Sequence, residues 1–242
     1  KLIPLLPLIL EKVYKKQILP KLKKFPVNMM IHTPGVRNIV YKKVLKQLMD
    51  SFGGEFLEVV IGGAAMNVEV ENFLRAIKFP YTVGYGMTEC GPLISYSRYF
   101  DLPQGSCGAP MDYVQVRIDS SDPIHTPGEI LVKGENVMDG YFKNSEATEA
   151  ALDSEGWLHT GDLGVLNEKG QIFIKGRCKT MILGASGQNI YPEHIEGVFN
   201  NKYYVQESLV IEKYHKLVAL IFPDFERADH HKLSRAELME II

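Results

Sequence analysis

Two short hydrophobic runs with an amphipathic segment between them organise the first third of the chain. Phe56–Ile61 and Tyr81–Tyr85 are largely apolar, which is typical of strands buried on both faces. Between them Val68–Ile77 has helical spacing, and its inward positions are Val70, Phe73, Leu74 and Ile77. A glycine-rich loop follows each run. This order predicts a parallel α/β sheet with both loops at its carboxyl edge, where such sheets bind ligands.

The segments before this sheet predict helices. Glu11–Leu22 and Tyr41–Met49 have helical spacing, and Ser51-Phe52-Gly53-Gly54 ends the second helix. The first residues, Leu2–Leu10, are apolar, but this run is too short to cross a bilayer and contains two prolines. It also lacks an initiator methionine and a small-residue cleavage site, which argues against a signal peptide. We therefore expect a buried or interfacial segment there.

From Ser106 to Gly176 the pattern changes to short alternating strands. One short helix, Glu146–Leu152, interrupts them, and turns such as Ser121-Asp122-Pro123 separate them. The predicted strands are Val114–Ile118, Gly128–Gly134 and Gln171–Lys175. Closely spaced strands of this kind indicate an antiparallel unit attached to the parallel sheet.

The chain after Arg177 predicts part of a small α+β unit. Proline in the first turn marks a helix over Pro192–Asn200, and two strands follow at Ser208–Glu212 and Leu217–Pro223. Ser234-Arg235-Ala236-Glu237 has the form of a capping box, whose helix runs into the last residue. We therefore expect the chain to be a fragment of a larger protein.

These elements together predict the α/β fold class. We expect a parallel sheet portion plus an antiparallel β-barrel-like subdomain, followed by the start of a small α+β C-terminal domain. The expected limits are 1–105 for the carboxyl part of a large α/β domain, 106–177 for its β-rich subdomain and 178–242 for the small domain.

The composition is that of an ordinary globular protein, and the charge limits the classes of binding partner to expect. The 242 residues are 45% hydrophobic and 23% charged, and the net charge of −2 indicates no nucleic-acid partner. Cys90, Cys107 and Cys178 show no metal-ligand or disulfide spacing, which favours a reducing, cytoplasmic compartment. One lysine run could rest on anionic lipid at the inner face of the membrane, although a solvated helix face is favoured. The run comprises Lys12, Lys15, Lys16, Lys21, Lys23 and Lys24.

The second glycine loop, Gly84-Tyr85-Gly86-Met87-Thr88-Glu89, is the first candidate for chemistry. Glu89 stands just past a strand end with no basic neighbour in sequence. Magnesium prefers carboxylate and phosphate oxygens, so Thr88 and Glu89 suit a metal-bound phosphate; a solvated loop glutamate is the alternative. The flanking glycines let a flat ligand stack on Tyr85, although a lone tyrosine here is more often part of the core.

Two further candidates lie in the β-rich region. Asp162 follows a Thr-Gly turn, and its carboxylate suits the two vicinal hydroxyls of a ribose, while an Asx-turn cap explains it equally well. Arg177 stands at a strand end, where it could bond ribose or phosphate oxygens or form a surface ion pair. Together with Tyr85 and Glu89, these residues suit a nucleotide monophosphate with magnesium beside its phosphate, bound in one shared crevice.

These segments resemble the ordered motifs of the adenylate-forming (AMP-binding) superfamily, which includes acyl-CoA synthetases, luciferases and adenylation domains of peptide synthetases. The resemblance runs from about Phe56 to Glu196 and is closest to bacterial long-chain fatty acid–CoA ligases. The motifs that carry it are Gly62-Gly63-Ala64-Ala65, Gly84–Glu89, Gly128–Gly134, His159-Thr160-Gly161-Asp162, Gly176-Arg177 with Lys179, and Gly187–Glu196.

The resemblance implies an ATP-dependent acid–thiol ligase with two half-reactions. A fatty or other carboxylic acid would attack the α-phosphate of ATP to give acyl-adenylate, and coenzyme A would then displace AMP. Magnesium would bind Glu89, and Thr88 would contact the phosphate. Tyr85 would stack on adenine, with Gly63 and Ala64 along its edge, and Asp162 and Arg177 would hold the ribose. Gly86 and Met87 are the other implied nucleotide-binding residues. Lys179 would be the hinge of the mobile small domain, and Gly187 would leave room for the coenzyme A arm.

The resemblance also has departures and leaves alternatives open. Leu183 stands where several relatives carry a lysine, and His194 replaces a commonly acidic residue. The loop that grips the β- and γ-phosphates is expected before the chain begins and the catalytic lysine beyond Ile242. We therefore expect the isolated chain to be unable to make acyl-adenylate. Ligases for aryl acids or carrier proteins, and a non-catalytic nucleotide-binding module, stay open, as do the acid's chain length and the oligomeric state.

Overall fold

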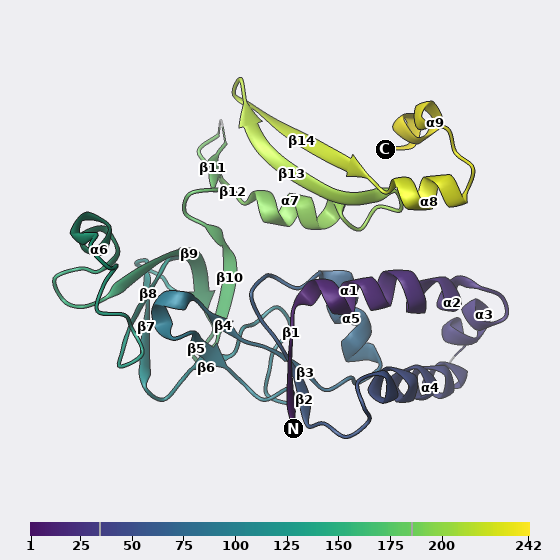
Figure 1. Ribbon diagram of the computed structural model, residues 1–242, viewed down its shortest axis with the longest axis horizontal. Coiled ribbons are helices and arrows are strands. Elements are labelled where there is room, and N and C mark those ends of the chain that lie inside the picture. The colour runs from purple at the N-terminus through teal and green to yellow at the C-terminus, as the bar shows by residue number, and fades with distance from the viewer. Residues whose placement is uncertain (34, 185) are drawn as a thin grey trace. The chain divides into compact units, whose positions relative to one another are not determined.

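The computed structural model describes residues 1–33, 35–184 and 186–242 (Figure 1). By its internal contacts the chain divides into two units. The first consists of residues 1–160 and 164–174, and the second of residues 161–163 and 175–242. The three domains expected from the sequence, with limits at 105/106 and 177/178, stay a prediction.

Helices dominate the first fifty residues, after one short strand, β1 (Leu2–Leu5). The helix predicted over Glu11–Leu22 is confirmed, although it is built from α1 (Pro7–Val13), a π-helical turn η1 (Tyr14–Ile18) and α2 (Leu19–Lys23). After α3 (Val27–His32), α4 (Val36–Ser51) confirms the second predicted helix and its end. Within the described ranges, no helix combines the length and the apolar character needed to cross a membrane.

A parallel sheet of order β1-β2-β3 confirms the predicted α/β core. β2 (Glu58–Ile61) lies between β1 and β3 (Tyr81–Val83) and is parallel to both. The edge strand β1 was not predicted, because Leu2–Leu10 indicated only a buried or interfacial segment. Pro4 is compatible with β1 because an edge strand needs hydrogen bonds on one side alone.

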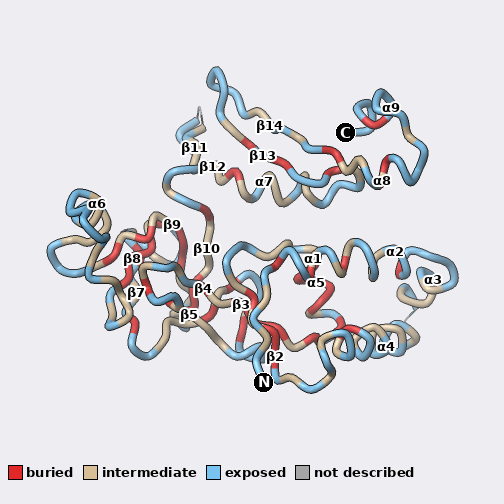
Figure 2. Tube along the Cα trace, in the orientation of Figure 1, coloured by how far each residue is buried: buried red, intermediate tan, exposed pale blue. Residues whose placement is uncertain are grey.

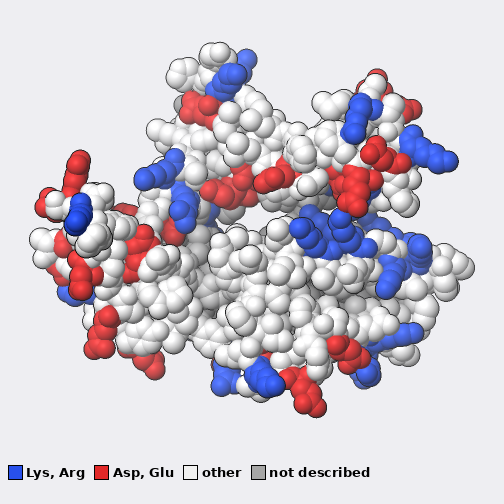
Figure 3. All heavy atoms as spheres, viewed as in Figure 1, with Lys and Arg blue, Asp and Glu red and all other residues white. Residues whose placement is uncertain are grey.

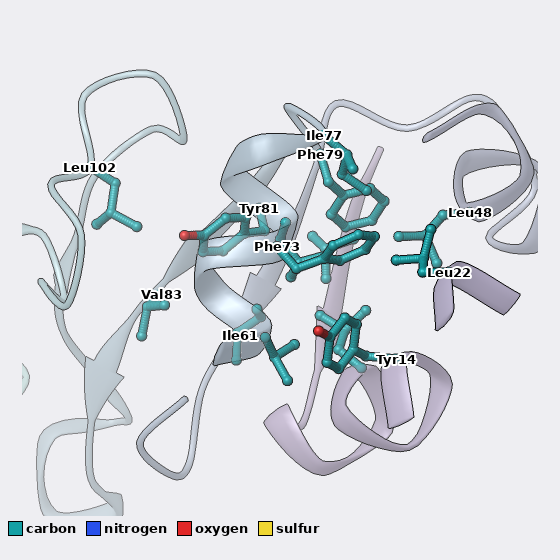
Figure 4. Close-up of a cluster of buried hydrophobic side chains, with 14 residues drawn as sticks. Tyr14, Leu22, Leu48, Ile61, Phe73, Ile77, Phe79, Tyr81, Val83 and Leu102 are labelled. Atoms are coloured by element: carbon teal, nitrogen blue, oxygen red, sulfur yellow. The ribbon is translucent and has the colours of Figure 1, made fainter. Parts of the chain in front are cut away.

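The helix between β2 and β3, α5 (Val68–Ala76), packs its predicted face inward. It begins at Asn67, whose side chain accepts hydrogen bonds from the backbone N–H groups of Glu69 at 2.9 Å and Val70 at 3.3 Å. Figure 2 shows buried positions concentrated along α5, β2 and β3. The four predicted inward residues, Val70, Phe73, Leu74 and Ile77, are all buried. They belong to one hydrophobic cluster, to which α2 and α4 contribute Leu22 and Leu48 (Figure 4).

Two buried carboxylates fix the segment that follows this sheet. Glu58 accepts hydrogen bonds from the Tyr96 hydroxyl and from the backbone N–H of Tyr99, the latter at 3.0 Å. Glu71 accepts from the Tyr81 hydroxyl and from the backbone N–H of Gly105, both at 3.0 Å. Burial, reinforced by the bond to Glu58, raises the pKa of Tyr96 to about 12. The segment from 96 to 105 is therefore tied to β2 and α5.

Antiparallel strands form the β-rich region, as predicted, but in the described residues they make open sheets rather than a closed barrel. One sheet has the order β4-β5-β6 and the other β10-β9-β8-β7, and α6 (Ser145–Ala151) confirms the predicted helix. The strands are β4 (Tyr85–Gly86), β5 (Leu93–Tyr96), β6 (Ala109–Pro110), β7 (Val114–Asp119), β8 (Gly128–Gly134), β9 (Leu158–Leu166) and β10 (Ile172–Arg177). The predicted strand Tyr81–Tyr85 is thus divided, because Tyr85 pairs in β4.

The second unit confirms the small α+β pattern. A short antiparallel pair, β11 (Ile182–Leu183) and β12 (Asn189–Ile190), precedes α7 (Pro192–Phe199), which has proline in its first turn. The hairpin of β13 (Val205–Lys213) and β14 (Lys216–Pro223) follows, then α8 (Phe225–His230). The last helix, α9 (Arg235–Ile241), begins with the predicted capping box between Ser234 and Glu237.

Candidate functional site

The two glycine loops of the first unit lie side by side. A Cβ atom added to Gly62, just after β2, would be 3.7 Å from the carbonyl oxygen of Gly84, just after β3. The backbone N–H of Gly84 donates to the carbonyl of Ile61 at 2.8 Å. Gly63 has a φ of +87°, which glycine adopts without strain, and both Gly63 and Ala64 are exposed. The carboxyl edge of the sheet therefore presents both loops together, as expected.

Tyr85 is a core residue in this structure. Its side chain is 6% exposed and belongs to the hydrophobic cluster of the β-rich region, together with Ile94 and Val132. The alternative considered for Tyr85, a side chain packed in the core, is therefore what the structure shows. Contact between Tyr85 and an adenine ring stays a prediction.

The packing of β4 against β5 requires glycine at position 86. A Cβ atom at this position would lie 2.0 Å from the carbonyl oxygen of Pro92, so only glycine lets β4 approach β5 this closely. The sequence interpretation, in which the glycine makes room for a ligand, missed this contact. Met87 follows it, and its backbone N–H donates to the same carbonyl at 2.9 Å.

We expect Gly86→Ala to lower the free energy of unfolding by about 3 kcal/mol, since the added methyl group overlaps backbone atoms that cannot rotate away. Urea unfolding of the chain measures the effect. Gly62→Ala is the matched control, because its added Cβ would make only ordinary contact. Equal stability of the two variants would contradict this explanation.

Glu89 is held by a segment far away in sequence. It lies in a 3-10 turn, η2 (Thr88–Cys90), and its Oε1 accepts a hydrogen bond from the Tyr141 hydroxyl at 2.8 Å. The backbone N–H of Met138 donates to the carbonyl of Glu89 at 2.8 Å, and Asn136 Nδ2 donates to the carbonyl of Cys90 at 2.6 Å. Sequence reasoning missed Tyr141, because the contact spans 52 positions and neither end has a local signal for it.

The surroundings of Glu89 fit a magnesium ion that also binds phosphate. Thr88 is exposed, Glu89 is half-buried, and no ion pair involves Glu89 in residues 1–33, 35–184 and 186–242. Those residues contain no cluster of three His, Cys, Asp or Glu side chains. A single carboxylate is compatible with magnesium, because the ion keeps several waters and takes phosphate oxygens as its other ligands. Glu89 as a metal ligand stays a prediction.

Tyr141 is protonated when it donates to Glu89. This hydrogen bond is the main cause that raises the pKa of the Tyr141 phenol, with burial and the charge of Glu89 adding to it. The phenol therefore keeps its proton at neutral pH and holds one oxygen of the carboxylate in place. A partner of this kind orients a metal ligand without touching the metal.

We expect Tyr141→Phe to raise the magnesium concentration needed for half-maximal nucleotide binding by about tenfold, since orienting partners of metal ligands typically contribute 10–100-fold in affinity. Titrations of the chain with magnesium at fixed ATP measure the effect. Tyr113→Phe is a control for removing a partly exposed tyrosine hydroxyl elsewhere. If both variants matched the wild-type chain, Tyr141 would have no orienting role.

Asp162 lies inside strand β9, not after a turn, so the sequence interpretation of its surroundings was wrong. Thr-Gly-Asp has turn preference, but β9 runs through it from Leu158 to Leu166, and Gly161 adopts a φ of +71° that glycine tolerates without strain. Asp162 is 6% exposed, and its Oδ1 lies 3.0 Å from Nε of Arg177 at the end of β10. The ion pair considered for Arg177 is therefore present, and the ribose-binding role of both residues stays a prediction.

The residues just before Asp162 have structural partners. The hydroxyl of Thr160 donates to the carbonyl of Ile130 at 2.7 Å, and His159 Nδ1 lies 2.8 Å from Glu129 Oε2. Both contacts join β9 to β8. They fix the strand on which Asp162 stands.

The remaining predicted residues lie in the second unit. Lys179 is exposed in the turn that follows β10, and Gly187, with a φ of +79°, lies in the turn between β11 and β12. A Cβ atom at Gly187 would meet nothing within 4 Å. Leu183 is exposed, and the ring of His194 lies 5.6 Å from that of Tyr191. The hinge and coenzyme A roles stay predictions.

The candidate residues thus form two groups. The first unit carries Gly63, Ala64, Tyr85, Gly86, Met87, Thr88 and Glu89, and the second carries Asp162, Arg177, Lys179 and Gly187. A shared crevice for both groups stays a prediction.

Comparison with known proteins identifies a family and several relatives of this chain. A family model described as AMP-binding enzyme matches residues 9–142, more than half of the chain. The chain is 32% identical over 218 residues to 4-coumarate–CoA ligase 1 of Solanum tuberosum, covering 84% of the chain and 39% of that protein. It is 32% identical over 243 residues to long-chain-fatty-acid–CoA ligase 5 of Rattus norvegicus, covering 92% and 36%. The chain therefore spans less than two fifths of the length of these relatives.

Solved structures of an o-succinylbenzoate coenzyme A synthetase from Bacillus subtilis are also similar. The complex with AMP has a TM-score of 0.65 at 29% identity, covering 83% of this chain and 42% of that one. The complex with ATP and a magnesium ion has a TM-score of 0.63 at 28% identity, covering 80% and 45%. These similarities confirm the mixed α/β fold class.

Proposed function

Because the chain belongs to the AMP-binding enzyme family, we propose that it is part of an ATP-dependent acid–CoA ligase. In the first half-reaction a carboxylate oxygen of the acid attacks the α-phosphorus of ATP, and pyrophosphate leaves. In the second, the thiol sulfur of coenzyme A attacks the acyl carbonyl, its proton is lost, and AMP leaves. The products are an acyl-CoA, AMP and pyrophosphate.

One observation carries this proposal: the family match over residues 9–142 includes both glycine loops, Thr88, Glu89 and the Tyr141 that binds Glu89. The relatives named above support the ligase chemistry, since two are CoA ligases and one is a CoA synthetase. That synthetase is described with ATP and magnesium bound, which supports the same pair of ligands here.

In the proposed first step the η2 turn acts on the phosphates. A magnesium ion bound there would neutralise phosphoryl charge. Glu89 would be its protein ligand, with the carboxylate oriented by Tyr141. The exposed hydroxyl of Thr88 would donate to a phosphoryl oxygen, which stabilises the charge that develops during attack.

The nucleoside would be bound by residues of both units. Tyr85 would contact adenine, with Gly63, Ala64, Gly86 and Met87 of the two neighbouring loops along its edge. Asp162 would accept hydrogen bonds from the two ribose hydroxyls, and Arg177 would contact ribose oxygens.

The second unit would serve the thiol step. Its proposed role as a small mobile domain from residue 178 onward makes Lys179 the hinge, where few residues absorb a large change in φ and ψ. Gly187 stands in a turn where a side chain would meet open space, and a pantetheine arm would pass there.

For the acid we propose a long-chain fatty acid. The alignment with the rat long-chain-fatty-acid ligase covers 92% of this chain, against 84% for the potato 4-coumarate ligase at the same identity. The coumarate relatives favour an aryl acid as the second candidate. The resemblance of the motifs to bacterial long-chain fatty acid–CoA ligases supports the same acid.

ATP–pyrophosphate exchange by the natural protein that contains this sequence tests the reaction and the acid together. We expect exchange with palmitate above that with 4-coumarate and o-succinylbenzoate. Faster exchange with an aryl acid would replace the fatty acid proposal but keep the ligase. AMP binding without exchange on any of these acids would identify a non-catalytic nucleotide-binding module instead.

A further inference from the structure

Positive charge is concentrated in the first fifty residues of the chain. Residues 1–50 contain ten lysines and one arginine but only one glutamate and one aspartate, a net charge of +9. The whole chain has a net charge of −2, so residues 51–242 carry −11. A segment this basic within an acidic chain points to an anionic partner.

These lysines gather on the helices that follow β1. Basic residues occupy the last turns of α1, η1 and α2, and the first turns of these helices hold no acidic residue. Figure 3 shows Lys and Arg side chains grouped over α1 and α2. Lys12, Lys21 and Lys24 are exposed. The inward residues Leu10, Tyr14 and Leu22 are buried, so the helices already use their core-facing side.

Large apolar side chains stand exposed beside the lysines. Phe25 is 81% exposed and directly follows Lys24 in the connection from α2 to α3, and Met29 on α3 is 59% exposed. Leu8 and Ile9 of α1 are exposed as well. We call this set, Leu8, Ile9, Lys12, Lys21, Lys24, Phe25 and Met29, the basic surface.

We propose that the basic surface binds the headgroup layer of a bilayer that contains anionic phospholipid. Lysines next to exposed apolar side chains match such an interface, where the ammonium groups meet phosphates and the apolar groups enter the acyl boundary. Nucleic acid is the weaker match. Arg37 is the only arginine in residues 1–50, and Phe25 is the only aromatic residue of the basic surface, whereas sites for single strands stack successive bases on several aromatic side chains. The proposal is independent of the ligase proposal, since it concerns binding and not catalysis.

Vesicle flotation tests the proposal with the whole chain. We expect partition onto phosphatidylcholine vesicles that contain phosphatidylglycerol, little partition onto pure phosphatidylcholine, and release by added salt, because screening weakens the attraction. Equal partition onto both kinds of vesicle would overturn it. So would binding of single-stranded RNA that matches or exceeds binding to the anionic vesicles.

A charge variant isolates the lysines. Lys12→Gln, Lys21→Gln and Lys24→Gln together should weaken partition about 100-fold, since each lysine near an anionic surface contributes about fivefold. The matched control replaces the exposed Lys169, Lys202 and Lys216 with Gln, which removes the same net charge elsewhere. An equal loss in both triple variants would overturn the proposed surface. Unchanged thermal unfolding verifies that each variant is folded.

An apolar variant separates insertion from general attraction to polyanions. Phe25→Ser should weaken partition about tenfold, because a phenyl group leaves the acyl boundary. Phe142→Ser, at a position that is 89% exposed in the β-rich region, is the control and should have no effect. Full partition by Phe25→Ser would contradict contact between the α2–α3 connection and the bilayer.

Discussion

Asp162→Ala is expected to weaken AMP binding by the chain about 100-fold. Two hydrogen bonds from ribose hydroxyls to a carboxylate contribute about 3 kcal/mol in total, which corresponds to that factor. The Asp162 carboxylate is buried in β9, and its Oδ1 lies 3.0 Å from Nε of Arg177. Isothermal titration calorimetry with AMP measures the loss.

Two controls separate the ribose role from stability. Asp162→Asn keeps the shape of the side chain and should recover part of the affinity, because an amide oxygen still accepts one hydrogen bond. Asp101→Ala removes an exposed aspartate and should leave AMP affinity unchanged. Wild-type affinity of a folded Asp162→Ala chain would count against ribose binding at this residue.

Glu89→Ala is expected to lower kcat/KM for acyl-adenylate formation by the natural protein about 100- to 1000-fold. The substitution removes the proposed magnesium ligand, and loss of one stabilising group for charge at the reacting centre typically has this effect. It also removes the acceptor for the Tyr141 hydroxyl. Pyrophosphate release at saturating ATP measures the rate.

The isosteric variant distinguishes charge from shape at this position. Glu89→Gln keeps an acceptor for Tyr141 but has no negative charge, so its rate should stay low at every magnesium concentration. Glu168→Ala, in an exposed turn, is the control for loss of a carboxylate and should behave like the wild-type protein. Full activity of Glu89→Gln would remove Glu89 from the metal site.

Local periodicity was enough to predict most elements that carry the site. The apolar run of β2, the amphipathic spacing of α5 and the glycine loops are encoded in neighbouring residues, and so were read directly from the sequence. The capping box at Ser234 was found for the same reason. The pairing of β2 with β3 followed from the strand–helix–strand order.

Elements with conflicting local preferences were missed. β9 contains Gly161 and Gly164, which indicate turns, yet its strand is held by neighbours on both sides in the sheet. β1 contains Pro4, which is compatible with a strand only at a sheet edge, and the place of β1 in the sheet depends on tertiary structure. The bond from Tyr141 to Glu89 depends on tertiary structure alone, so sequence reasoning found the glutamate but not the group that holds it.

The ion pair between Asp162 and Arg177 joins two side chains of unequal freedom. The aspartate side chain is 8% exposed on a central strand, whereas the arginine side chain is 69% exposed at a strand end. A sugar that approached this pair would meet an acceptor that is already buried and ion-paired, so the aspartate would lose less side-chain entropy on binding than an exposed one. The guanidinium, in contrast, is mostly exposed and has room to turn toward another oxygen while the aspartate keeps its position.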